Sequence, residues 1–133
     1  MSNQATRQTV PTAQPRDLAG PALRAFFNIA SAWNLSTAQQ RKLLGSPPSS
    51  TFFKWKRELS GSLPRDVLER ISYVLGIYKA LQILFPDESR ADAWISSPNT
   101  APTFGGQSAL DRMLGGNVGD LYAVRQYLDA QRG

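Results

Sequence analysis

The amino-acid sequence predicts an all-α fold, and three observations support this prediction. Apolar residues recur at intervals of three and four along most of the chain, the spacing that gives a helix one buried face. Capping residues, glycines and prolines divide these periodic segments into separate helices. No window alternates apolar and polar residues over five or more positions with the β-branched enrichment typical of a strand.

The first predicted helix covers residues 21–34, PALRAFFNIASAWN. Pro21 suits its first position, because an N–H at that position would lack an intrahelical partner in any case. Leu23, Phe26 and Trp33 then fall on one apolar stripe. The polar composition of residues 1–20 predicts a disordered arm ahead of this helix.

Two shorter helices follow. Residues 35–45 form the first, with Ser36 or Thr37 as its cap and a glutamine three residues on as the capping-box partner. The prolines in 46–48 cannot continue a helix, so a tight turn is expected there. The next helix covers about residues 49–59, and one of the two serines at its start is expected to cap it.

A long apolar-periodic stretch begins at Pro64 and ends near residue 85. Gly76 either splits it into two helices or only weakens one, and periodicity leaves both open. Asp87 can cap a helix over 88–95. Residues 96–107 form a loop by composition. Two helices end the chain: Ser108 and Asp111 fit a capping box for a short one, and Asn117 caps the last.

The composition argues against several function classes. The chain has no cysteine and no histidine, which removes thiol chemistry, the commonest general base and the commonest metal ligand. We therefore expect no catalytic residues, no metal site and no cofactor. No apolar run approaches the roughly 18 residues that a membrane span needs. The N-terminus lacks an apolar signal segment, so a cytoplasmic protein is expected.

The net charge of +5 is unevenly distributed. Residues 36–60 carry five cations against one anion, whereas residues 61–133 carry seven cations against eight anions. A local excess of this kind indicates either an anion-binding surface or simply a solvated basic face. Composition alone leaves both open.

The segment TFFKWKRE, residues 51–58, lies within this basic region. On a helix, Phe52, Trp55 and Leu59 share the core face and leave the cations outside. A short helix, a tight turn and a second helix that begins with small polar residues form a helix-turn-helix, in which the second helix reads base edges and cations hold phosphates. The predicted DNA contacts are Arg41, Lys42, Ser49, Ser50, Thr51, Phe53, Lys54, Lys56 and Arg57.

A plain helical hairpin with a basic outer face would give the same pattern. One such module binds DNA weakly, so DNA binding would also imply a dimer or a larger assembly.

Residues 35–129 resemble the Xre/MbcA/ParS family of bacterial antitoxins. The likeness rests on LSTAQQRKLLG, STFFKWKRE and LPRDVLERISYVLGIYKALQILFPD, followed by an ordered series of motifs. These are W-x-x-x-P-N from Trp94, F-G-G-x-S-x-L from Phe104, Gly115-Gly116, and V-x-x-Y-L-D from Val124. Many relatives have proline where this chain has Ala109, a difference that should leave the helix intact.

The resemblance implies a type II toxin–antitoxin system, in which the antitoxin sequesters a RES-domain toxin that destroys NAD. It also implies dimers that bind the promoter of their own operon, often with the toxin, and C-terminal residues that block the toxin's NAD pocket. We therefore expect a polar arm over residues 1–20, a helix-turn-helix DNA-binding domain over 21–75 and a helical toxin-binding domain over 76–133.

Toxin-binding residues are expected in the second half of the chain, and several have another interpretation. Trp94 and Phe104 are either core residues or partner anchors, and Asn99 can instead satisfy the loop backbone. The paired glycines can simply turn the chain, and the arginines of the last helix can be solvated. The full set is Trp94, Asn99, Phe104, Gly105, Gly106, Met113, Tyr122, Arg125, Gln126, Asp129 and Arg132.

Other functions remain open at this stage. A stand-alone helix-turn-helix regulator would bind DNA without a toxin partner, and a helical adaptor would serve only as a scaffold. An enzyme is disfavoured, because the chain has neither histidine nor cysteine and no paired carboxylates in an evident pocket.

Overall fold

The computed structural model describes residues 15–133, which form helices joined by turns and one longer loop. Within this range the β pairing consists of an isolated bridge between Pro98 and Ser108, and no strand forms. The all-α prediction is confirmed. The helices are α2 (Pro15–Ala32), α3 (Thr37–Leu43), α4 (Ser49–Glu58), α5 (Arg65–Leu84), α6 (Glu88–Trp94), α7 (Ala109–Met113) and α8 (Val118–Arg132).

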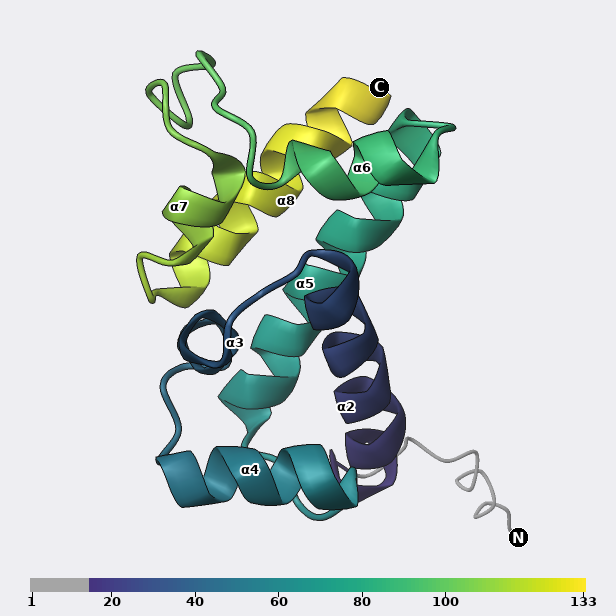
Figure 1. Cartoon of the computed structure of the whole chain (residues 1–133), viewed down its shortest axis with the longest axis vertical. Coiled ribbons are helices and arrows are strands. Elements are labelled where there is room, and N and C mark those ends of the chain that lie inside the picture. Colours follow the sequence, from purple (N-terminus) through teal and green to yellow (C-terminus); the bar gives the residue numbers. More distant parts are fainter. Residues whose placement is uncertain (1–14) are drawn as a thin grey trace, which may run out of the picture.

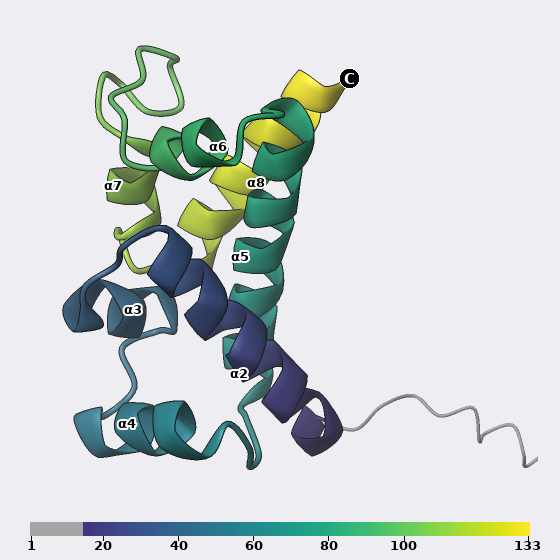
Figure 2. The same cartoon turned by 45° about the vertical axis from the view of Figure 1, so that its right-hand side comes forward.

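Helix α5 is the central element of the molecule. Its 20 residues would span about 30 Å at 1.5 Å per residue, and its two ends carry different partners. Helix α2 packs along it toward one end, and α8 together with α6 packs toward the other. As a result α4 lies at one end of the molecule and α6, α7 and α8 lie at the opposite end (Figure 1, Figure 2).

One hydrophobic core joins these helices. Phe26 of α2, Phe52 of α4 and Leu43 of α3 are fully buried at one end, and Leu121 and Leu128 of α8 are buried at the other. Buried residues of α5 connect the two groups along its whole length. The expected boundary between residues 75 and 76 therefore falls inside α5, a helix that contributes to both regions.

The start of α2 differs from the prediction. The helix begins at Pro15 and contains Pro21, so Pro21 is not its first residue. Ala19 is fully buried, and a side chain on Gly20 would begin 3.1 Å from the carbonyl oxygen of Leu59. The helix continues through Pro21, although this residue cannot donate a backbone hydrogen bond. Of the expected arm, residues 15–20 are helical, and residues 1–14 lie outside the described residues.

Most helix caps form as predicted. Ser36 caps α3 in a capping box with Gln39, with hydrogen bonds of 2.8 and 3.1 Å. Ser108 and Asp111 form the same box at α7, and Asp87 caps α6 by accepting from the Ser89 N–H at 3.0 Å. These local side-chain bonds replace the partners that first-turn N–H groups lack.

The predicted serine cap of α4 is wrong. The N-cap residue is Pro48, in an extended conformation with φ −53° and ψ 148°, and no side chain bonds to the first turn. Ser49 and Ser50 already lie inside the helix. The extended ψ of Pro48 makes this residue, and not a serine, the last one before the helix.

Gly76 does not divide α5, which continues through it. A side chain at this position would collide with the guanidinium of Arg125, which crosses α5 there. The glycine therefore permits close approach of α8 to α5.

Two further observations bound what residues 15–133 can do. No helix among them is both long and apolar enough to cross a membrane. No group of three or more histidine, cysteine, aspartate or glutamate side chains in the same range could hold a metal ion.

Candidate functional site

The turn between α3 and α4 is held by backbone and arginine contacts. Gly45 and Ser46 adopt left-handed φ values of 90° and 59°, and Pro47 is buried. The guanidinium of Arg41 donates to the carbonyl oxygen of Pro47 at 2.8 and 3.3 Å. Arg41 therefore stabilises the turn. Its Nε and one terminal nitrogen already bond Pro47, so a phosphate contact would use the other terminal nitrogen.

The inner face of α4 is the face predicted from TFFKWKRE. Phe52 is fully buried and Trp55 is nearly so, while Leu59 is half-buried at the C-cap. The Phe52 ring meets the ring of Phe27 on α2 edge-on, with centroids 5.8 Å apart. This aromatic contact fixes α4 against α2.

The outer face of α4 carries a continuous exposed stripe. Ser50, Phe53, Lys54 and Arg57 occupy positions i, i+3, i+4 and i+7, so they lie on one side of the helix. Phe53 is 45% exposed, so its ring is open to solvent or to a partner. We call these four residues, with exposed Ser49 at the helix start, the α4 outer stripe.

The remaining predicted DNA contacts lie away from the α4 outer stripe. Thr51 is half-buried. The Lys56 ammonium lies 5.7 Å from the centroid of the Phe27 ring, a cation–π contact that holds it toward α2. Lys42 is exposed on α3 close to Gly116.

The electrostatics of α4 favour an anion. Its first-turn N–H groups have no side-chain cap, so they present partial positive charge at the helix start. Lys54 has no ion-pair partner among the described side chains. Arg57 pairs only with the adjacent Glu58 at 3.4 Å, and an ion pair this exposed contributes little.

At the other end of the molecule, residues 98–108 form a closed loop. The Asn99 N–H donates to the Gln107 carbonyl at 2.9 Å, and the Gly106 N–H donates to the Asn99 carbonyl at 2.8 Å. The Asn99 side chain accepts from the Ala101 N–H at 2.9 Å. Gly105 and Gly106 have φ values of 59° and 92°, which only glycine adopts freely, so both turn the chain.

Three aromatic side chains anchor this loop to α6 and α8. Phe104 meets Tyr127 edge-on at 5.0 Å and Trp94 edge-on at 5.8 Å. Trp94 stacks on Tyr127 with centroids 6.2 Å apart and ring planes 18° apart. Phe104 is only 6% exposed, whereas the other two remain partly open to solvent. Trp94 is thus both a core residue and part of the surface.

Met113 and Phe104 belong to the core of this chain. Met113 on α7 is almost fully buried, as Phe104 is in the loop. Both were predicted to bind a partner, and only a rearrangement of the C-terminal region would bring them to one.

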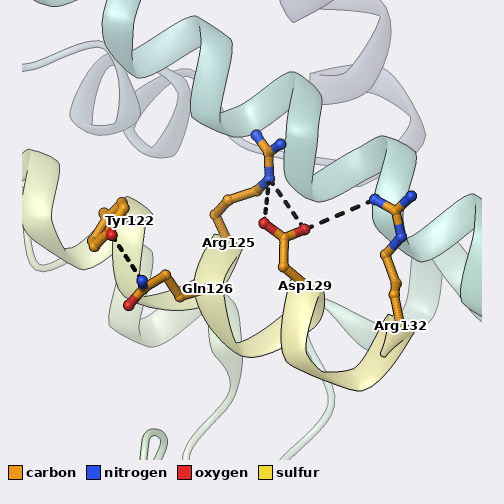
Figure 3. A network of polar contacts seen from close by, with 5 residues as sticks. All are labelled: Tyr122, Arg125, Gln126, Asp129 and Arg132. Atoms are coloured by element: carbon orange, nitrogen blue, oxygen red, sulfur yellow. Dashed lines mark hydrogen bonds and ion pairs between the residues drawn. The ribbon is translucent and has the colours of Figure 1, made fainter.

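The other predicted partner residues of this half lie on one side of α8. Figure 3 shows these residues in two groups along the helix. One group joins Tyr122 to Gln126, and the other joins Asp129 to Arg125 and Arg132. The Asp129 carboxylate accepts from the Arg125 Nε at 3.2 Å and lies 3.8 Å from an Arg132 nitrogen. The Gln126 amide donates to the Tyr122 hydroxyl at 2.7 Å. We call these five residues the α8 polar stripe.

Two residues at this end were not predicted. Ile83 near the end of α5 is 52% exposed, and Gln131 lines a pocket of about 220 Å³ with Trp94 and Tyr127. Ile83 lies in the apolar-periodic stretch that begins at Pro64.

Comparison with known proteins agrees with this arrangement. Residues 13–76 match the antitoxin Xre-like helix-turn-helix domain, and residues 80–133 match the antitoxin Xre/MbcA/ParS C-terminal toxin-binding domain. The chain belongs to the Xre/MbcA/ParS antitoxin family. It is also 61% identical over 111 residues to the uncharacterized protein y4oB of Sinorhizobium fredii (strain NBRC 101917 / NGR234), and the match covers 84% of each chain.

Membership of this antitoxin family assigns a class of function to each end of the molecule. The α4 outer stripe belongs to the helix-turn-helix domain, and the α8 polar stripe belongs to the toxin-binding domain. Neither family is an enzyme family, in agreement with the expectation from composition.

Proposed function

We propose that this antitoxin neutralises a RES-domain toxin that degrades NAD, and that it represses its own operon through the helix-turn-helix domain. The supporting observation is that α4 and α8 lie toward opposite ends of α5 (Figure 1), and that each carries polar or charged side chains that are mostly exposed. A chain with this arrangement can hold DNA and a protein partner at the same time.

The DNA side of the proposal rests on the α4 outer stripe. Ser49 and Ser50 can donate to or accept from base edges, Phe53 can contact a thymine methyl, and Lys54 can reach guanine or phosphate. Two copies would be needed to read two half-sites, so the proposal includes a homodimer or a larger assembly with the toxin.

The toxin side rests on the α8 polar stripe together with the half-open Trp94. Tryptophan, tyrosine and arginine are the residues that most often carry the binding energy of protein interfaces, and all three types occur here. We include the loop residues Asn99, Gly105 and Gly106 as part of this surface, because they present backbone next to the aromatic residues.

The RES assignment is tested with the product of the adjacent reading frame. That product, expressed alone, should arrest growth and deplete cellular NAD, and co-expression of this chain should restore both. A stable complex should copurify. An adjacent product without a RES domain that neither binds this chain nor depletes NAD would refute the assignment and favour the stand-alone regulator.

Autorepression is tested with a reporter fused to the promoter upstream of this gene. Expression should fall when the wild-type chain is supplied and should recover when Lys54 and Arg57 are both replaced by alanine. A matched control is Arg90→Ala, which removes an exposed cation of α6 at the far end of the molecule. Equal repression by the wild type and the double variant would contradict the proposed role of α4.

A further inference from the structure

Arg70 occupies an unusual position between the two functional ends. It lies on α5, its side chain is only 13% exposed, and its Nη2 donates to the carbonyl oxygen of Gly116 at 3.0 Å, 46 residues away in sequence. Gly116 belongs to the turn between α7 and α8. Arg70 therefore ties the central helix to the toxin-binding domain.

The same side chain also fills the space beneath the helix-turn-helix turn. A side chain on Gly45 would begin 3.0 Å from the Arg70 Nε and 3.3 Å from its Cζ, so the guanidinium lies directly against the backbone that links α3 to α4. Gly45 and Gly116 both have φ values near 90° and both follow the C-terminal end of a helix. Free carbonyl groups at such ends carry partial negative charge, which suits a cation.

The polar partners of Arg70 are few for a buried guanidinium. Its Nε has no hydrogen-bond partner among the described residues, and the Asp66 carboxylate is 3.9 Å away and largely exposed. A largely buried cation with one direct hydrogen bond is costly to maintain, so its energy depends strongly on the positions of the groups around it. A shift of either turn would change that energy.

Helix α3 and the α7–α8 turn also lie next to each other in both views of the molecule (Figure 1, Figure 2). A side chain on Gly116 would begin 3.6 Å from the Cε of Lys42 on α3. Lys42 of α3 thus lies close to the α7–α8 turn, and Arg70 lies next to both Gly45 and Gly116.

We propose that Arg70 is a positioning residue that couples the two surfaces, so that a toxin on the α8 polar stripe and DNA on the α4 outer stripe change each other's affinity through this side chain. This inference rests on the function proposed above. By linkage, the factor by which the toxin changes DNA affinity must equal the factor by which DNA changes toxin affinity.

The test measures the Kd of the full chain for its own labelled promoter fragment, with and without a saturating amount of the adjacent gene product. For the wild type the two Kd values should differ by about fivefold or more, within the usual range of such coupling. For Arg70→Met the ratio should fall to within about twofold of one. The control Arg112→Met removes a cation that bonds Asp120 at 3.0 Å inside the C-terminal domain and does not touch the α3–α4 turn, so its ratio should stay near the wild-type value.

A second variant keeps the test decisive if Arg70→Met does not fold. Arg70→Lys retains the charge, but one ammonium cannot bond Gly116 and fill the space below Gly45 together. Its ratio should be at least twofold closer to one than that of the wild type. A wild-type ratio of one, or variants with the wild-type ratio, would overturn the coupling and leave the proposed function intact. Failure of the wild type to bind either partner would overturn both.

Discussion

At the scale of single residues, the two neighbouring phenylalanines of α4 have opposite environments. Phe52 is fully buried against Phe27, whereas Phe53 is 45% exposed and touches Phe52 from outside at 5.2 Å between ring centroids. The two residues are consecutive, but consecutive side chains of a helix point in different directions, so the Phe53 ring lies outside the core. The pair therefore marks the buried face and the exposed face of one helix.

Phe52→Ala and Phe53→Ala should accordingly have different effects. We expect Phe52→Ala to lower the free energy of unfolding by about 3–5 kcal/mol, as for other buried phenylalanines. We expect Phe53→Ala to change it by less than about 1 kcal/mol and yet to weaken promoter binding. Urea unfolding and a DNA titration of both variants check this. Full DNA affinity in Phe53→Ala would remove Phe53 from the interface.

Asp87 gives a residue-scale prediction for pH. The hydroxyl and N–H of Ser89 both donate to its carboxylate, at 2.9 and 3.0 Å, and these bonds lower the pKa of Asp87. The lowered pKa means that this cap stabilises the fold above the ordinary aspartate pKa of about 3.9. The contribution is lost as the pH falls through the depressed value in the folded state.

The measurement is a carboxyl titration of Asp87 by NMR in the wild type and in Ser89→Ala. Because the Ser89 hydroxyl is the largest cause of the shift, its removal should raise the pKa of Asp87 toward its usual range. Identical titration curves would show that the hydroxyl has no part in the shift.

At the scale of helices and loops, the sequence predicts what depends on local chemistry. The capping boxes at Ser36 and Ser108 and the cap at Asp87 need only residues within three positions of each other, and all three form. The start of α2 depends instead on the burial of Ala19 against other helices, which a local pattern does not contain.

The same limit applies to the candidate surfaces. Helical periodicity correctly placed Phe52 and Trp55 inside, because a single helix determines which residues share its face. It did not place Arg70 between the two domains, because that position depends on a contact with Gly116, 46 residues away in sequence. Nor did it place Arg41 on the turn, because helical periodicity does not describe the backbone of the loop at Pro47.

Gly76 provides a prediction at this scale. Alanine there favours the helical conformation of α5 by about 1 kcal/mol, but its methyl group would displace the guanidinium of Arg125. The displaced Arg125 would lose its pairing with Asp129. We therefore expect Gly76→Ala to keep its helix content and stability within about 1 kcal/mol of the wild type, and to bind the adjacent gene product more weakly.

Circular dichroism and a binding titration of Gly76→Ala make this comparison. Gly119→Ala is a matched control, because a side chain there meets nothing within 4 Å and the residue lies in α8. Equal toxin affinity in the wild type and both variants would show that the position of Arg125 does not matter for binding.

At the scale of the whole molecule, the surface proposed for DNA and the surface proposed for the toxin differ in charge and lie far apart. The basic excess lies in residues 36–60, and the C-terminal region is nearly neutral. Because α4 and α8 are at opposite ends of α5, a change of charge on α4 alters the field near DNA and is largely screened at α8 by physiological salt (Figure 2). DNA binding should therefore depend on salt far more than toxin binding does.

The double variant Lys54→Ala, Arg57→Ala tests this separation. If both cations hold phosphates, each contributes about 0.9 to the dependence of log K on log salt, so the slope should become less steep by about 2. Promoter affinity should fall, whereas neutralisation of the adjacent gene product should match the wild type. Salt titrations of promoter binding and growth rescue measure the two activities.

The converse variant Trp94→Ala, Arg125→Ala should lose rescue and keep the wild-type salt slope, provided that its thermal unfolding confirms a folded chain. Loss of rescue in the α4 variant would show that the helix-turn-helix domain also contacts the toxin.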